Sequence, residues 1–137
     1  MEKLWLMAYG QQKGWRVEVD GVGNVLMRIK VTRGKEVEKW IILQTHMDMV
    51  DEKLAEVKHD FTKDPIEVEE ENGWLKTKGE TTLGADNGVG MAIALYVAEY
   101  LPHPPMGLLF TIDEETGLTG AQALKKGWLQ FKQLINL

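Results

Sequence analysis

Two short runs of apolar residues constrain the fold of this chain more than any other feature. Residues 40–44 and 106–112 are apolar almost throughout, which is typical of central strands buried on both faces of a sheet. Between them, residues 89–100 carry apolar side chains at intervals of four, as in a helix. Strands that alternate with helices predict an α/β fold with a mixed, largely parallel central sheet and flanking helices.

The apolar side chains of the helix over 89–100 form two rows, Val89/Ile93/Val97 and Ala92/Tyr96/Tyr100. We expect this stripe to face the core, and we expect Asp86 and Asn87 to stand at the positive end of the helix. Prolines at 102–105 should end it.

Further elements are expected on either side of this centre. A helix over 3–13 with Gly14 as its stop should precede an antiparallel edge hairpin, whose strands span 15–20 and 25–31. Asn72-Gly73 predicts a second hairpin, because both residues tolerate the positive φ angles of a type I′ turn. The remaining expected segments are a loop at 32–38, a loop or short helix at 51–58, hairpin strands at 66–68 and 74–77, a helix at 118–126 and a strand at 131–137.

Size and composition limit the class of protein. A chain of 137 residues with 44% hydrophobic content can form one compact domain. It has no cysteine, so neither disulfides nor thiolate metal sites are expected, and a cytoplasmic location suits it. No apolar stretch reaches the roughly 20 residues of a membrane span. A net charge of −5 with scattered cations argues against nucleic-acid binding.

Three short acidic segments stand beside the apolar stretches. They are His46-Met47-Asp48, Asp86 within the glycine-flanked residues 84–88, and Asp113 to Glu115. In α/β sheets, ligands collect beyond the carboxyl ends of the strands. Histidine nitrogen together with carboxylate oxygen suits zinc, manganese or cobalt, and a spare carboxylate can act as a base on water. The three segments together predict metal-dependent hydrolysis.

Each acidic segment also has an ordinary structural explanation. His46 could be a loop histidine beside an aspartate cap, Asp86 an N-cap, and residues 113–115 a solvated turn. Glu114 and Glu115 are adjacent at a strand end and should face opposite ways, so one could bind metal and the other act as general base. The order and strand-end placement of all three segments favour the metal site. We expect His59 and His103 to be surface histidines.

Four longer motifs carry a resemblance to a known family. They are Leu43-Gln44-Thr45-His46-Met47-Asp48-Met49-Val50, His59-Asp60-Phe61-Thr62-Lys63-Asp64-Pro65-Ile66, residues 82–90 around Asp86, and Glu114-Glu115-Thr116-Gly117. With these motifs the chain resembles the co-catalytic zinc aminopeptidase, carboxypeptidase and aminoacylase family. The second motif narrows the resemblance to the aminoacyl-histidine dipeptidases, also called Xaa-His dipeptidases or peptidase D.

The resemblance implies roles for five residues. His46 would bind one metal ion, Asp86 would bridge two, and Glu115 would bind the other, with zinc expected and manganese or cobalt as alternatives. Asp48 would position the His46 imidazole, and Glu114 would be the general base. It also implies a zinc-exopeptidase-like fold, hydrolysis of small dipeptides with C-terminal histidine by a water that two metals activate, and a homodimeric parent protein.

The chain departs from the family pattern at its end. Family members continue into Ile-Asn-x-Asp, whose aspartate is a metal ligand, and carry a further histidine ligand much later, whereas this sequence ends at Ile135-Asn136-Leu137. The resemblance therefore implies that residues 1–137 are part of a metallopeptidase catalytic domain, with incomplete metal sites and little or no activity alone.

Two other functions stay open at the level of sequence. A non-catalytic α/β module could use the same fold for assembly or interaction, and its unpaired sheet edges would favour self-association. A phosphate or nucleotide binder is disfavoured, because the glycine-rich phosphate-binding motifs are absent from the sequence.

Overall fold

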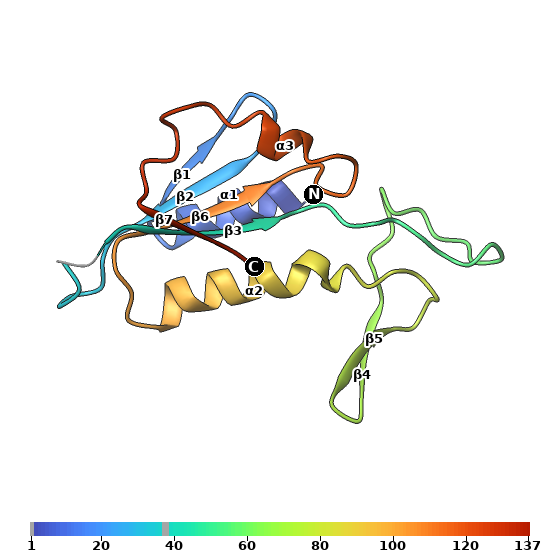
Figure 1. The fold of residues 1–137 in the computed structure, drawn as a ribbon. Coiled ribbons are helices and arrows are strands. Elements are labelled where there is room, and N and C mark those ends of the chain that lie inside the picture. Colours follow the sequence, from blue (N-terminus) through green and yellow to red (C-terminus); the bar gives the residue numbers. More distant parts are fainter. Residues whose placement is uncertain (1, 37–38) are drawn as a thin grey trace. The chain divides into compact units, whose positions relative to one another are not determined.

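The computed structural model of the protein describes residues 2–36 and 39–137 (Figure 1). Positions 37–38 of the expected loop at 32–38 lie outside the described residues. No helix in the described part of the chain has the length and apolar character needed to cross a membrane. The elements are α1 (Glu2–Gln12), β1 (Arg16–Val19), β2 (Val25–Ile29), β3 (Ile41–His46), β4 (Val68–Glu71), β5 (Trp74–Thr77), α2 (Ala85–Tyr100), β6 (Met106–Thr111), α3 (Thr119–Gln122) and β7 (Gln133–Asn136).

The described chain forms two compact units. The first unit runs up to Asp48 and resumes from Asp86 to Leu137, and the second is Met49–Ala85. The prediction that the chain is part of one metallopeptidase domain stays a prediction.

The first unit is built on a sheet with the strand order β1-β2-β6-β3-β7. Strands β6, β3 and β7 run parallel, while β2 pairs antiparallel with β6 and with β1. The last register pair between β3 and β6 is His46 with Thr111, so the residues that follow these strands emerge at the same edge. The mixed sheet, parallel in its centre with an antiparallel hairpin at one edge, confirms the predicted fold class.

Each face of this sheet carries a separate apolar core. On one face, Leu6 of α1 and Ala94 of α2 pack against strand residues that include the fully buried Phe110. On the other face, Leu26, Ile42 and Leu109 are covered by partly buried side chains of residues 124–131. Figure 1 shows α2 below the sheet and the chain around α3 above it.

The face that α2 buries differs from the prediction. Gly90, Ala94 and Ala98 are buried, whereas Ile93 and Tyr96 of the expected stripe are 46% and 58% exposed. Small side chains let the helix backbone approach the sheet closely, and this close packing outweighs the burial of the larger side chains. The prediction that this stripe faces the core is therefore wrong, although Val97, which belongs to the stripe, does pack against the core.

The helix predicted at 118–126 is also shorter than expected. Only Thr119–Gln122 is helical, and it follows Leu118 with a left-handed φ of 60°. Leu124 and Trp128 pack against the second apolar core. The chain leaves helical conformation before Lys126 because these larger side chains must reach the sheet.

The second unit contains the predicted hairpin of β4 and β5. Asn72 and Gly73 have φ angles of 53° and 81°, as a type I′ turn requires. Val68 pairs with Thr77 and Glu71 with Trp74. The hairpin prediction is confirmed. Residues 51–58 form a loop in which Lys53 makes a single bridge with Thr81.

A polar contact joins the end of α1 to α2. The Tyr9 hydroxyl and the Lys13 ammonium group both donate hydrogen bonds to the Glu99 carboxylate. The bond to Glu99, together with partial burial and the nearby negative charge, raises the pKa of Tyr9 to about 12.

This raised pKa predicts a loss of stability at high pH. Unfolded tyrosine ionises near pH 10, so the contribution of Tyr9 is complete below that pH and is lost between about pH 10 and 12. We expect the free energy of unfolding in urea to fall over this range, and Tyr9→Phe to reduce the fall. Equal losses in the wild type and in Tyr9→Phe would contradict this assignment.

Candidate metal site

His46 lies at the end of β3 with its ring buried. Its Nδ1 atom is 2.9 Å from the backbone carbonyl oxygen of Asp48, and its Nε2 atom is 3.0 Å from Oδ1 of Asp86. A carbonyl oxygen can only accept a hydrogen bond, so Nδ1 carries a proton. With the proton on Nδ1, Nε2 is the ring nitrogen left to bind a metal ion, and it is the one that faces Asp86.

Asp48 holds the loop that follows β6. Its two carboxylate oxygens accept hydrogen bonds from the backbone N–H groups of Glu114 and Glu115, at 3.1 and 3.0 Å. The nearer carboxylate oxygen is 3.6 Å from Nδ1 of His46, farther than the carbonyl of the same residue. Asp48 thus connects the imidazole and the acidic loop, through its backbone on one side and its carboxylate on the other.

Glu114 and Glu115 follow β6 in a tight loop that begins at Asp113, whose φ is 51°. Glu114 is half-buried and lines a cavity of about 290 Å³, together with His46 and Asp86. Glu115 is exposed. The loop therefore presents one carboxylate to the cavity and keeps the other at its surface.

His46, Asp86 and Glu115 come together as the sequence predicts. Each offers one ligand atom, and the three atoms lie within 4.8 Å of one another. Two ligands of one tetrahedral zinc ion stand about 3.3 Å apart when each is about 2.0–2.1 Å from the metal. The 3.0 Å between His46 and Asp86 is close to this value, so the donor set fits a divalent metal. The roles of these residues as ligands stay a prediction.

Asp86 is presented by an anchored turn at the start of α2. Asp86 and Asn87 have non-helical backbone angles within this helix, and Nδ2 of Asn87 donates a 2.7 Å hydrogen bond to the Leu137 carbonyl. A Cβ atom at Gly90 would lie 1.8 Å from Oδ1 of Asn87, so only glycine leaves room for this anchor. The anchoring roles of Asn87 and Gly90 were not predicted from the sequence.

Asn24 supports the loop after β6 from the opposite side. Its buried side chain donates to the Asp20 carboxylate and the Gly120 carbonyl and accepts a bond from the Ile112 N–H, at 2.7, 2.8 and 3.0 Å. Burial acts against ionisation of Asp20, but the bonds from Asn24 and from backbone N–H groups outweigh it and lower the pKa of Asp20. From the sequence, Asn24 was predicted only as a turn residue.

The other two histidines differ from the sequence prediction. His103 is 6% exposed and its Nδ1 atom lies 2.7 Å from the Pro104 carbonyl oxygen, so its assignment to the surface is wrong. Its backbone is also held by Thr32, whose N–H donates to the His103 carbonyl and whose hydroxyl accepts from the His103 N–H, at 3.1 and 3.2 Å. His59 belongs to the second unit, where it is half-buried against the Phe61 ring, with the centroids 4.5 Å apart.

Comparison with known families adds a decisive observation. Residues 24–137 match the model of Peptidase family M28. The chain belongs to this family. The chain is 47% identical over 134 residues to the cytosol non-specific dipeptidase of Escherichia coli K12. It is 32% identical over 114 residues to the uncharacterized protein YqjE of Bacillus subtilis. These stretches are 96% and 80% of this chain, but only 27% of each relative.

Two solved structures resemble this chain. Aminoacylhistidine dipeptidase from Vibrio alginolyticus matches with a TM-score of 0.90 and 41% identity, over 98% of this chain and 28% of that one. Aminopeptidase PepT from Bacillus cereus matches with a TM-score of 0.72 and 23% identity, over 96% of this chain and 36% of that one. This second likeness shows the fold alone. The resemblance to aminoacyl-histidine dipeptidases and the zinc-exopeptidase fold are confirmed. The named enzymes among these homologues are peptidases, which are hydrolases.

Proposed function

We propose that this chain contributes to metal-dependent hydrolysis of dipeptides that end in histidine. The observation that carries the proposal is the meeting of His46, Asp86 and Glu115 beside the half-buried Glu114. The name of the Vibrio relative supports aminoacyl-histidine substrates. The chain spans about a quarter of the length of its curated relatives, so the activity proposed is that of the whole protein.

Three side chains would hold two divalent ions, zinc before manganese or cobalt. His46 would bind one ion, Glu115 the other, and Asp86 would bridge them. The metals would polarise the peptide carbonyl and make water acidic enough to lose a proton near neutral pH. Catalytic zinc usually has three protein ligands, and the described residues supply two per ion here. We therefore expect slow turnover, if any, from this chain alone.

Glu114 would be the general base of the reaction. Its carboxylate lines the cavity beside the proposed ligands, where it can take a proton from the attacking water and deliver it to the departing amine nitrogen. Asp48 fixes Glu114 by accepting its backbone N–H and holds the imidazole through its own carbonyl. We assign Asp48 a positioning role in catalysis.

The substitution Glu114→Gln tests this function. It keeps the size of the side chain and its backbone bond to Asp48, but it removes the base. In the whole protein, we expect zinc affinity to stay within about twofold while histidine release from β-alanyl-histidine falls by a factor on the order of 10²–10⁴. A comparison of glycyl-histidine with glycyl-leucine tests the preference for C-terminal histidine.

Two outcomes would contradict the proposal. Hydrolysis that survives removal of metal by a chelator would exclude the metal mechanism. Equal rates on both dipeptides would replace histidine specificity with the broader specificity in the name of the Escherichia coli relative.

A second candidate is a non-catalytic module for assembly. Strand β7 lies at an edge of the sheet, and its Leu134 and Ile135 side chains are 53% and 46% exposed. Such an edge favours strand pairing between copies of the chain. The homodimeric parent protein that the family resemblance implies is part of the same proposal. Concentration-dependent association in light scattering, without zinc binding, would favour this candidate. The relative that is named a cytosol enzyme supports a cytoplasmic location under either proposal.

A further inference from the structure

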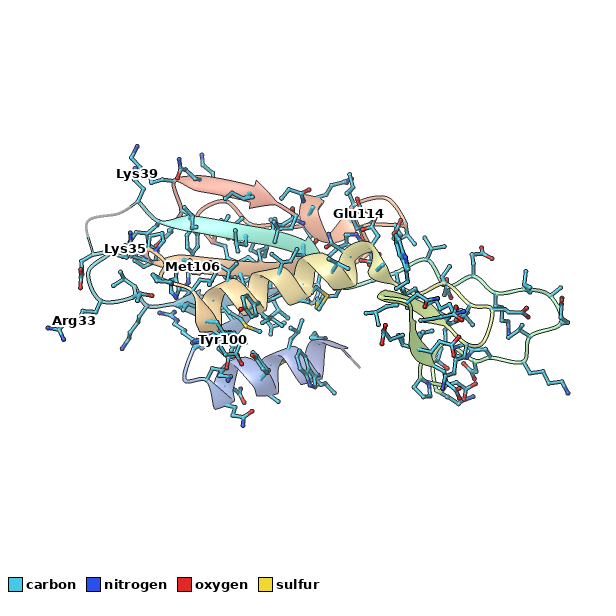
Figure 2. All side chains as sticks on the ribbon, turned by 90° about the horizontal axis from the view of Figure 1, so that it is seen from below. Arg33, Lys35, Lys39, Tyr100, Met106 and Glu114 are labelled. Atoms are coloured by element: carbon cyan, nitrogen blue, oxygen red, sulfur yellow. The ribbon has the colours of Figure 1, made fainter. Side chains whose placement is uncertain are left out.

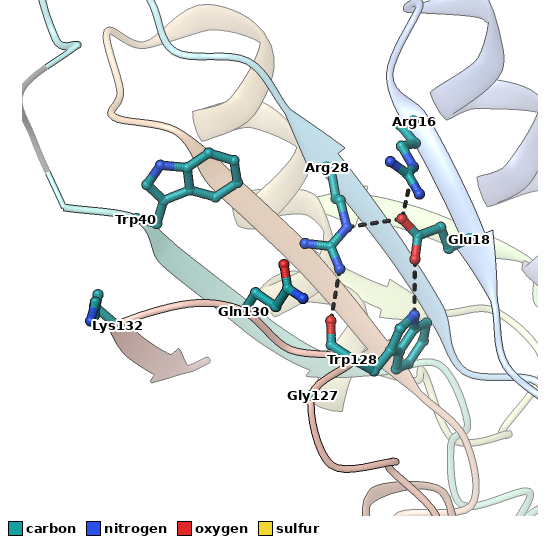
Figure 3. Close-up of a pocket in the computed structure, with 8 residues that line it drawn as sticks. All are labelled: Arg16, Glu18, Arg28, Trp40, Gly127, Trp128, Gln130 and Lys132. Atoms are coloured by element: carbon teal, nitrogen blue, oxygen red, sulfur yellow. Dashed lines mark hydrogen bonds and ion pairs between the residues drawn. The ribbon is translucent and has the colours of Figure 1, made fainter.

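A groove at the other end of the sheet gathers positive charge and aromatic side chains (Figure 3). It measures about 550 Å³, a size typical of small-molecule sites. The described residues that line it are Arg16, Glu18, Arg28, Trp40, Gly127, Trp128, Gln130 and Lys132. We call it the cationic groove. Three cations and one carboxylate leave a local surplus of positive charge, although the whole chain carries −5.

The cationic groove is separate from the proposed metal site. Trp40 stands just before β3 and His46 at its end, and six residues of strand span about 20 Å. Figure 2 shows the same separation on the neighbouring strand, where Met106 marks the start of β6 and Glu114 lies beyond its far end. A ligand in the groove would therefore leave the cluster around His46 free.

Two arginines stand directly opposite each other in the groove. Arg16 and Arg28 are register partners on β1 and β2, where like charges normally repel. Glu18 lies 2.9 Å from Nε of each arginine and accepts a 3.0 Å bond from the Trp128 indole. Burial acts against ionisation of Glu18, but the bonds from Arg28 and Trp128 outweigh it and lower the pKa of Glu18. One carboxylate thus offsets two guanidinium groups.

Arg28 is preorganised for an oxyanion. Its side chain is 19% exposed, donates to Glu18 and to the Trp128 carbonyl, and lies over the Phe131 ring at 5.4 Å. These bonds use Nε and one terminal nitrogen, and among the described residues the other terminal nitrogen has no hydrogen-bond partner. A fixed guanidinium with spare N–H donors loses little entropy when it binds carboxylate or phosphate.

We infer that the cationic groove binds a small amphipathic anion, namely a carboxylate or phosphate carried on an aromatic ring. Arg28 and Lys132 would contact the oxyanion, and the indoles of Trp40 and Trp128 would contact the ring. Figure 3 shows these four side chains around the same space. Aromatic walls add affinity for planar groups, which distinguishes this groove from a simple phosphate site.

NMR titration of the ¹⁵N-labelled chain tests this inference. The probes are benzoate, phenyl phosphate, neutral benzamide and inorganic phosphate, and the readout is the indole N–H signals of Trp40 and Trp128. We expect the two aromatic anions to shift both signals and to bind on the order of tenfold more tightly than benzamide or inorganic phosphate. Added salt should weaken their binding. The stronger of the two anions identifies carboxylate or phosphate as the preferred oxyanion.

Matched lysine variants locate the ligand. Lys132→Gln removes a cation of the groove whose side chain has no ion pair in the described part of the chain, so folding should be retained. Lys125→Gln removes an exposed lysine outside the lining. We expect Lys132→Gln to weaken benzoate binding about threefold or more and Lys125→Gln to leave it unchanged. Equal affinities in these two variants, equal binding of benzamide, or unmoved indole signals would each overturn the inference, and none would affect the zinc test of the proposed function.

Discussion

Replacing His46 with alanine is expected to weaken zinc binding by this chain about a hundredfold or more. Loss of partners that only support a ligand costs 10–100-fold in metal affinity, and His46 would supply the sole nitrogen in the cluster of three groups. Calorimetric zinc titration of the wild type and His46→Ala measures the change. The variant leaves Asp86 and Glu115 in place, so weak residual binding should persist.

His59→Ala is the matched control for this prediction. It removes an imidazole of the second unit that lies against Phe61 and is not part of the cluster that could hold a metal. Zinc affinity should be unchanged. If His59→Ala weakened binding as much as His46→Ala, zinc would be bound elsewhere and the proposed site would be wrong.

The elements that sequence patterns predicted best are those whose pattern has one structural solution. The short run of apolar residues at 106–112 forms β6 over Met106–Thr111, and every residue of the strand is buried, because a strand buried on both faces needs no polar side. Asn72-Gly73 becomes a hairpin because few other residues accept positive φ at both turn positions. At both positions, the conformation that the local residues favour is the one that the fold requires.

Prediction failed where packing selects among side chains of one helix. Residues 85–100 include both large apolar side chains and a row of small ones, and the small row faces the sheet. Periodicity alone identifies a helix but cannot tell close packing of Gly90 and Ala94 from burial of Ile93 and Tyr96. The helix expected at 118–126 failed for a related reason, since Leu124 and Trp128 pack against a sheet that the local sequence does not reveal.

The candidate site was partly predictable for a reason of topology. His46 and the residues after Thr111 meet because parallel strands β3 and β6 end in register. The supports were not predictable, because Asn24 acts on Ile112 and Asn87 on Leu137 across separations of 88 and 50 residues. Asparagine at such positions carries no periodic signal.

The largest effect on stability is expected from Phe110→Ala. Phe110 is fully buried in β6, between β2 and β3, and truncation of a core phenylalanine costs about 3–5 kcal/mol because a cavity remains. Total stabilities are about 5–15 kcal/mol, so the variant should be close to unfolding. Urea denaturation followed by tryptophan fluorescence measures the loss, and Tyr96→Ala, which truncates a 58% exposed ring, should stay within about 0.5 kcal/mol of the wild type.

Stabilisation of Phe110→Ala by zinc tests whether the core around Phe110 also positions the metal ligands. Ligand binding to the folded chain adds about 2.7 kcal/mol when zinc is at a hundred times its dissociation constant. We expect Phe110→Ala to retain this increment, because Asp48, Asn24 and Asn87 hold the site through polar bonds that do not involve the Phe110 side chain. If the increment were lost with the ring, packing of β6 against β3 would set the positions of the ligands, and the polar supports would be secondary to it.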